Sequence, residues 1–126
     1  MKYSFEKFTL GGSRFSPKVS IRSNGSLGLS QGILLRAGIS DNEWYVVLHY
    51  AREEKVIGIQ LTRDKDAQGA VKLIYRKSGT PENVTAAISA KSFLNYFDIP
   101  YDKTTNYEAE WDLEDQMIII PLKDQN

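Results

Sequence analysis

The chain has 126 residues, of which 41% are hydrophobic and 25% are charged, and this ordinary globular composition argues against a disordered or fibrous protein. The absence of cysteine excludes a disulfide framework and thiolate chemistry. The longest apolar runs fall far short of the ~20 residues that a membrane helix needs, and charges interrupt the aromatic side chains at the start, unlike in a secretory signal. We therefore expect one domain over residues 1–126, cytoplasmic and without a membrane partner.

The formal net charge is zero, but the charges are unevenly distributed along the chain. Residues 1–77 carry 13 Lys/Arg against 7 Asp/Glu, a balance of +6, and residues 78–126 carry 3 against 9, a balance of −6. One interpretation is that these parts attract each other within one fold or between copies of the chain. The other is that the basic part contacts a polyanion.

The first half of the chain predicts a hairpin, a short helix and a second hairpin. Residues 1–17 are expected to form an edge strand or an arm. Apolar and polar residues then alternate on both sides of Asn24-Gly25, a pair that favours a primed hairpin turn because both residue types tolerate a positive φ. Ser30 can cap a helix over residues 31–37, and Gly38 stands where a left-handed C-cap belongs. Strands are predicted at residues 44–50 and 56–61.

The second half repeats this order. Alternation at residues 71–76 predicts a strand, and residues 77–83 predict a loop. Ile88-Ser89 then matches Leu29-Ser30 ahead of a second short helix. An alternating strand is predicted next, at residues 107–111. Residues 117–122 then match residues 56–61 position for position. We therefore predict two β-α-ββ repeats, residues 18–63 and 70–123. The alternative is that common pieces align by chance.

Residues 18–61 resemble the AbrB/MraZ/SpoVT swapped-hairpin family of DNA-binding proteins. Gly25 stands at the turn glycine of that family, Gly38-Ile39 at the helix-end pair and Glu43 at the acidic position. Two copies in one chain are similar to the tandem arrangement of MraZ. The resemblance implies a mainly β fold with two short helices, in which the repeats form a double-split (swapped-hairpin) β-barrel-like domain. It also implies a role in transcription regulation through duplex DNA.

The chain departs from the family where the family contacts DNA. Ser26 stands at the position of an arginine, Ser30 at the position of a proline, and Leu34 and Leu35 at basic positions of the helix. We expect DNA binding to depend on the basic residues that remain, because lysine and arginine contacts to phosphates dominate affinity for DNA. These candidates are Arg14, Lys18, Arg22, Arg36, Lys72, Arg76 and Lys77.

The sequence predicts neither catalytic residues nor a cofactor, and no small-molecule substrate is evident. The single histidine, His49, lies in an apolar run, and the chain offers no further nitrogen or sulfur ligands for a zinc site. The acidic residues within 108–115 suit the solvent face of a strand and its loop, or alternatively a general acid/base pair or a hard-cation site. A competing hypothesis is a non-enzymatic protein-interaction or oligomerisation module that has lost DNA binding, with a homo-oligomer or another protein as partner.

Overall fold

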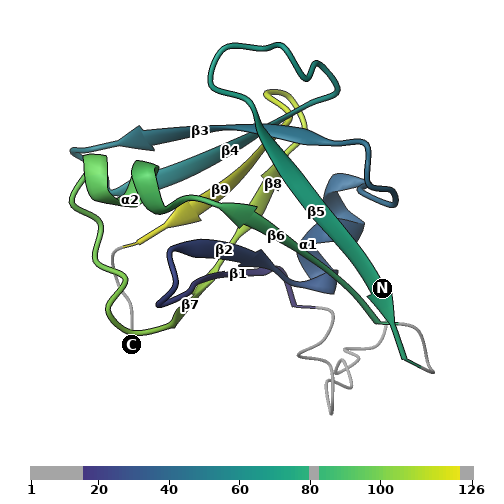
Figure 1. The fold of residues 1–126 in the computed structure, drawn as a ribbon, viewed down its shortest axis with the longest axis horizontal. Helices are drawn as coiled ribbons and strands as arrows, with labels where there is room; N and C mark the ends of the chain where they lie inside the picture. The colour runs from purple at the N-terminus through teal and green to yellow at the C-terminus, as the bar shows by residue number, and fades with distance from the viewer. Residues whose placement is uncertain (1–15, 80–82, 123–126) are drawn as a thin grey trace, which may run out of the picture.

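The computed structural model describes residues 16–79 and 83–122, and in these residues nine strands form one sheet flanked by two short helices (Figure 1). The prediction of a mainly β fold with two short helices is confirmed. In chain order the elements are β1 (Lys18–Ile21), β2 (Ser26–Leu29), α1 (Gln31–Ala37), β3 (Tyr45–Ala51), β4 (Val56–Thr62), β5 (Val71–Ser78), β6 (Asn83–Ser89), α2 (Lys91–Tyr96), β7 (Thr105–Glu108), β8 (Glu110–Asp112) and β9 (Met117–Pro121).

The sheet curls into a nearly closed barrel because its two outermost strands are consecutive in the chain. Its strand order is β7-β1-β2-β6-β5-β3-β4-β9-β8, and only Ala109 separates β7 from β8. β7 pairs with β1 and β8 with β9, so the chain changes partner at Ala109, whose amide donates to the Pro17 carbonyl at 2.9 Å. The predicted continuous strand over residues 107–111 is therefore wrong at Ala109, because alternation of side chains does not reveal a change of partner.

The core is an apolar ladder between β4 and β9. Ile57 lies opposite Ile120 and Ile59 opposite Ile118, and none of these four side chains is exposed to solvent. Full burial of one such side chain stabilises the fold by roughly 1.5–3 kcal/mol. Among the described residues no polar or charged residue is buried, and no helix is long and apolar enough to cross a membrane.

The hairpin between β1 and β2 is present as predicted, but its turn differs. The amide of Arg22 donates to the Ser26 carbonyl at 2.9 Å, which leaves three residues in the loop, and of these only Gly25 has a positive φ, +85°. A three-residue loop needs a single left-handed residue, whereas the predicted primed turn needs two. The Asn24 side chain instead accepts a hydrogen bond from the Ser26 amide at 3.0 Å.

Helix α1 has the predicted bounds and the predicted C-cap, since Gly38 is left-handed with φ +73°. Ser30 precedes the helix but makes no side-chain cap. Its hydroxyl instead accepts from the Lys18 amide at 2.9 Å and donates to the Ser16 carbonyl at 2.8 Å. The prediction of a capping role was wrong because this hydroxyl has a tertiary partner, the start of β1.

The predicted loop at residues 77–83 was too long. Lys77 and Ser78 belong to β5 and pair with Val84 and Asn83 of β6. The partner strand extends the ladder beyond the apolar alternation of β5, and Val84 is buried there. The prediction of a strand or arm at residues 1–17 falls, except for Ser16 and Pro17, outside the described residues.

We expect Gly25→Ala to destabilise the protein more than Gly38→Ala. Both positions are left-handed, which costs a residue with a side chain about 1–2 kcal/mol. An added Cβ at Gly25 would also lie 2.8 Å from Lys91 Cβ, whereas nothing lies within 4 Å of one at Gly38. Urea unfolding of both variants measures the difference. Equal losses would show that the contact with Lys91 does not restrict the turn.

Candidate nucleic-acid interface

Four neighbouring strands, β1, β2, β6 and β5, present one outer face that consists mainly of small side chains. Each of these strands has one fully buried residue at this level: Val19, Leu27, Ile88 and Leu73. Successive side chains of a strand point to opposite faces, so the residue next to each of these points outward. Register places one outward residue from each strand in a single row across the face, beginning on β7. This row is Asn106, Ser20, Gly28, Ala87 and Ile74.

Four of the seven predicted basic residues lie on this face. Lys18 and Arg22 stand two residues before and after Ser20, and Lys72 and Arg76 stand two residues before and after Ile74. Because side chains two apart on a strand share a face, all four project from the same side of the sheet. We call this surface, with its four cations and the small residues between them, the basic sheet face.

Arg22 crosses the middle of the basic sheet face. A Cβ at Gly28 would lie 2.3 Å from Arg22 Nη2 and 2.6 Å from Cζ, so the guanidinium covers the backbone of β2 where a side chain is missing. In the described part of the chain this guanidinium has no hydrogen-bond or ion-pair partner. Its donors are thus available to an anion on the outer surface.

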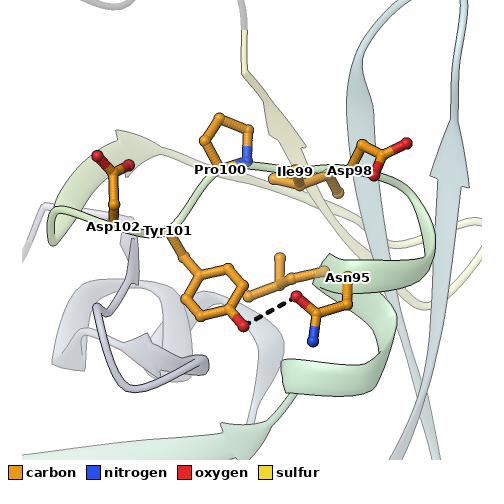
Figure 2. A pocket seen from close by; sticks show the side chains of 7 residues that line it. Asn95, Asp98, Ile99, Pro100, Tyr101 and Asp102 are labelled. Carbon is orange, nitrogen blue, oxygen red and sulfur yellow. Dashed lines mark hydrogen bonds between the residues drawn. The ribbon is translucent and has the colours of Figure 1, made fainter.

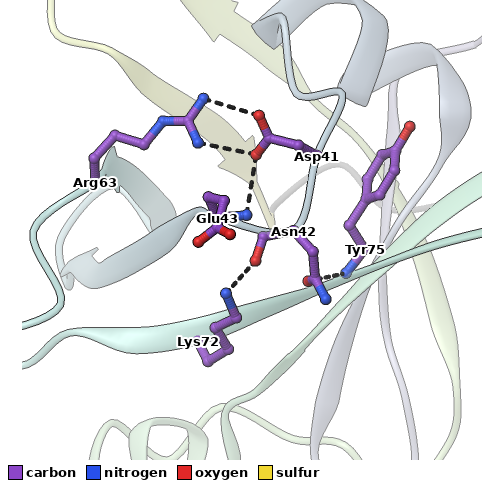
Figure 3. Close-up of polar contacts among 6 residues, drawn as sticks. All are labelled: Asp41, Asn42, Glu43, Arg63, Lys72 and Tyr75. Carbon is purple, nitrogen blue, oxygen red and sulfur yellow. Dashed lines mark hydrogen bonds and ion pairs between the residues drawn. The ribbon is translucent and has the colours of Figure 1, made fainter.

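Lys72 turns away from the centre of the face toward the loop before β3. Its ammonium donates to the Asn42 carbonyl (Figure 3). It also lies 4.8 Å from the centre of the Tyr45 ring. The Asn42 side chain accepts from the Tyr75 amide at 3.0 Å, which fastens the loop to β5. Lys72 therefore holds this loop as well as adding charge to the face.

Asp41 and Arg63 fix the other side of the same loop. Arg63 donates to both carboxylate oxygens of Asp41, at 2.9 and 3.2 Å (Figure 3). Its guanidinium also lies 3.9 Å from the centre of the Trp44 ring. The hydrogen bond from Arg63, with a second from the Glu43 amide, holds the pKa of the Asp41 carboxyl below its ordinary value. Such an exposed pair contributes little to stability, so its main effect is to position the loop.

The remaining predicted residues do not join this face. Arg36 lies on α1, where its guanidinium folds back on the Gly32 carbonyl at 3.4 Å. Lys77 follows Arg76 directly on β5 and therefore points to the opposite face of the sheet. Arg14 lies outside the described residues. Lys18 has an acidic neighbour, since Glu108 of β7 is its cross-strand partner. The basic and acidic parts of the chain therefore meet within the fold at this point.

One further basic residue near the face was not predicted. Lys91 begins α2, and its Cβ lies against Gly25 at the tip of the β1–β2 hairpin. The Gly25 carbonyl also accepts from the Ala90 amide at 3.0 Å. No local sequence pattern predicts that Lys91 lies here, because only the pairing of β2 with β6 brings it to the hairpin that also holds Arg22.

Other groups that the sequence singled out take part in local contacts. A ring nitrogen of His49 lies 2.9 Å from Gln60 Oε1, and Asp112 accepts from the Asp115 amide at 3.2 Å. Within the described ranges, no three histidine or acidic side chains are grouped so as to hold a metal ion. A hollow of about 410 Å³ follows α2, and Tyr101 donates to Asn95 across it at 2.8 Å (Figure 2).

Comparison with protein-family models, with curated proteins and with solved structures finds no match for this chain. The function is therefore argued from the geometry of the chain itself.

We expect Arg63→Leu to raise the pKa of Asp41 toward its ordinary value of 3.8, because it removes the hydrogen bonds that favour the carboxylate. The lowered pKa stabilises the folded state above the ordinary pKa, and this contribution disappears as the pH falls through the folded value. Carboxyl NMR titration measures the pKa. Arg63→Lys, which keeps the charge, should give an intermediate value, and an unchanged pKa in Arg63→Leu would contradict this assignment.

Proposed function

We propose that this protein is a non-enzymatic, DNA-associated regulatory protein of the AbrB/MraZ-like type, which contacts the phosphates of duplex DNA through its basic sheet face. The observation that carries the proposal is the Arg22 guanidinium, which has no partner among the described residues, on a face that also holds Lys18, Lys72 and Arg76. Cations spread over one face of a sheet suit the phosphate backbone, which dominates affinity for DNA.

Strand pairing supports the proposed duplication with swapped hairpins. The opening strand of each predicted repeat pairs with the third strand of the other repeat, since β1 pairs with β7 and β5 with β3. Matched strands also pair with each other, β2 with β6 and β4 with β9, and matched residues then face one another. These are Gly28 with Ala87 and Gly58 with Ile119.

Matched hydrogen bonds support the same relation. The Ile39 amide donates to the Leu34 carbonyl at 3.0 Å, and the Ile99 amide donates to the Leu94 carbonyl at 2.9 Å. Leu34 therefore corresponds to Leu94, 60 positions later, whereas Leu29 and its match Ile88 are 59 positions apart. The second repeat thus has one extra residue before α2, at Ala90. The family resemblance implies two repeats that exchange strands, and both the strand pairing and these hydrogen bonds support that proposal.

Arg22 offers a substitute for a family arginine that the chain lacks. The resemblance puts that arginine at Ser26, directly after the turn glycine. Ser26 faces Arg22 across the hairpin, since the Arg22 amide donates to the Ser26 carbonyl at 2.9 Å. A guanidinium from β1 that lies over β2 would thus supply charge close to the position where the family supplies it.

DNA binding should depend on salt, and its dependence should weaken when the face loses charge. We expect fluorescence anisotropy with a labelled duplex at ~50 mM salt to detect binding, and each lost phosphate contact to reduce the salt slope by about 0.9. Arg22→Ala and Arg76→Ala should each do so. Lys65→Ala is the matched control, because Lys65 is exposed on the loop between β4 and β5, which projects from the top of the barrel (Figure 1).

Absence of binding at that salt concentration, or equal effects of all three variants, would contradict the proposal. Sedimentation of the free protein over a wide concentration range separates DNA binding from the competing hypothesis. A module for self-association would form oligomers without DNA.

Gly28→Ala tests whether the position of Arg22 matters, beyond its charge. The added methyl group displaces a flexible side-chain end, so stability should change little while the guanidinium moves. We expect weaker DNA binding by several-fold, and no further loss when Gly28→Ala is added to Arg22→Ala, because contacting residues are not additive. Additive losses in this double-mutant cycle would show that Gly28 acts independently of Arg22.

A further inference from the structure

A second hollow, separate from the basic sheet face, opens beside α2. It has a volume of about 430 Å³ and is lined by residues from the end of β3, the turn after it, the segment after α2, β7 and the residue after β9. This volume lies within the range of sites for small ligands. The hollow adjoins the one in Figure 2, since Asp98, Ile99 and Pro100 line both.

The walls of this hollow are apolar and aromatic. Tyr50 and Phe97 pack with ring centres 5.1 Å apart, and Ile99, Tyr107 and Leu122 complete the walls. Burial raises the pKa of the Tyr107 hydroxyl, as expected for a ring partly withdrawn from water. Such walls fit the hydrocarbon or aromatic part of a ligand.

The rim of the hollow carries two cations against one carboxylate. Arg52 and Lys55 come from the β3–β4 turn, and Asp98 lies after α2. The Arg52 guanidinium stands 4.8 Å from the centre of the Phe97 ring. Within residues 16–79 and 83–122 the one ion pair is Arg63 with Asp41, so neither rim cation has a carboxylate partner. Glu53 and Glu54 of the same turn do not line the hollow, so the charged residues that do line it carry a net positive charge, which favours an anion.

The β8–β9 hairpin, which matches the β3–β4 hairpin in the predicted repeats, shows that such a turn does not need these cations. Both turns have four residues and end on a residue with a positive φ, Lys55 at +60° and Gln116 at +54°. The Lys55 carbonyl accepts from the Leu122 amide at 2.9 Å, and the Gln116 carbonyl accepts from the Leu61 amide at 3.0 Å. Where the first turn has Arg52 and Lys55, the second has Leu113 and Gln116. The two cations are thus a feature of the hollow beside α2, and a turn of this type does not require them.

We infer that this hollow binds an apolar carboxylate, with its hydrocarbon part against Phe97 and Tyr107 and its carboxylate between Arg52 and Lys55. The carboxylate group has two sources, a small free acid or the carboxyl end of a polypeptide. No residue that lines this hollow belongs to the basic sheet face, so this site is distinct from the proposed DNA surface.

Titration with phenylacetate, followed by amide NMR, tests the inference. We expect saturable shifts at Phe97, Ile99 and Leu122 with a dissociation constant of about a millimolar, the strength typical of a ligand of about ten heavy atoms. Phenylacetamide, which lacks the charge, and acetate, which lacks the ring, should each bind at least about tenfold more weakly, because one rim contact or the wall contact is lost.

The double variant Arg52→Leu/Lys55→Gln replaces both cations with the residues of the other turn. It should keep the fold and lose about tenfold or more in affinity for phenylacetate, with no effect on phenylacetamide. The converse variant, Leu113→Arg/Gln116→Lys, should leave binding unchanged. If the first variant unfolds, Lys55→Gln alone should still weaken binding.

The peptide Gly-Gly-Phe with a free or an amidated carboxyl end distinguishes the two sources. Tighter binding of the free peptide than of phenylacetate assigns the site to a chain end, and the reverse assigns it to a small acid. The inference is overturned by absence of saturable shifts, by equal binding of phenylacetate and phenylacetamide, or by unchanged affinity in the Arg52 and Lys55 variants.

Discussion

The structure depends on pairing between strands that are distant in the chain. β1 pairs with β7, and β5 pairs with β3, so each half of the chain contains a strand that pairs with the other half. The barrel closes because one segment serves both ends of the sheet and changes partner at Ala109. Such pairing must overcome the entropy of closing long loops, and buried ladders such as Ile57 with Ile120 and Ile59 with Ile118 supply the compensating free energy.

The sequence predicted those elements that local chemistry determines. Alternation located the strands, and Gly38 marked the end of a helix whose bounds were predicted without error. Errors arose where a tertiary partner competes with a local preference. The hydroxyl of Ser30 ties down the start of β1 and does not cap α1. The segment at Ala109 alternates as one strand should, yet its partners differ on either side, and a pattern of period two cannot encode the identity of a partner.

The candidate sites were predictable to different degrees for the same reason. Lys18 with Arg22 and Lys72 with Arg76 have the spacing of residues on one strand face, so the sequence could place each pair. That both pairs share one surface follows only from the contact of β2 with β6. Lys91 and the hollow between Arg52 and Phe97 had no signal in the sequence, because each joins residues from elements about 40 or more positions apart, by the numbering, through barrel closure.

Differences between the two halves carry more functional information than their similarities. Lys55 and Gln116 have the same left-handed φ at the end of their turns, and both carbonyls accept a backbone hydrogen bond, so this backbone conformation does not require a cation. Likewise Gly28 and Ala87 face each other on matched strands, yet only Gly28 lies beneath a guanidinium. Under the proposed duplication each position occurs twice, so one occurrence serves as a control for the other. Where one proposed repeat has a cation with no partner among the described residues and the other has a neutral side chain, the binding proposed here gives a reason for the cation.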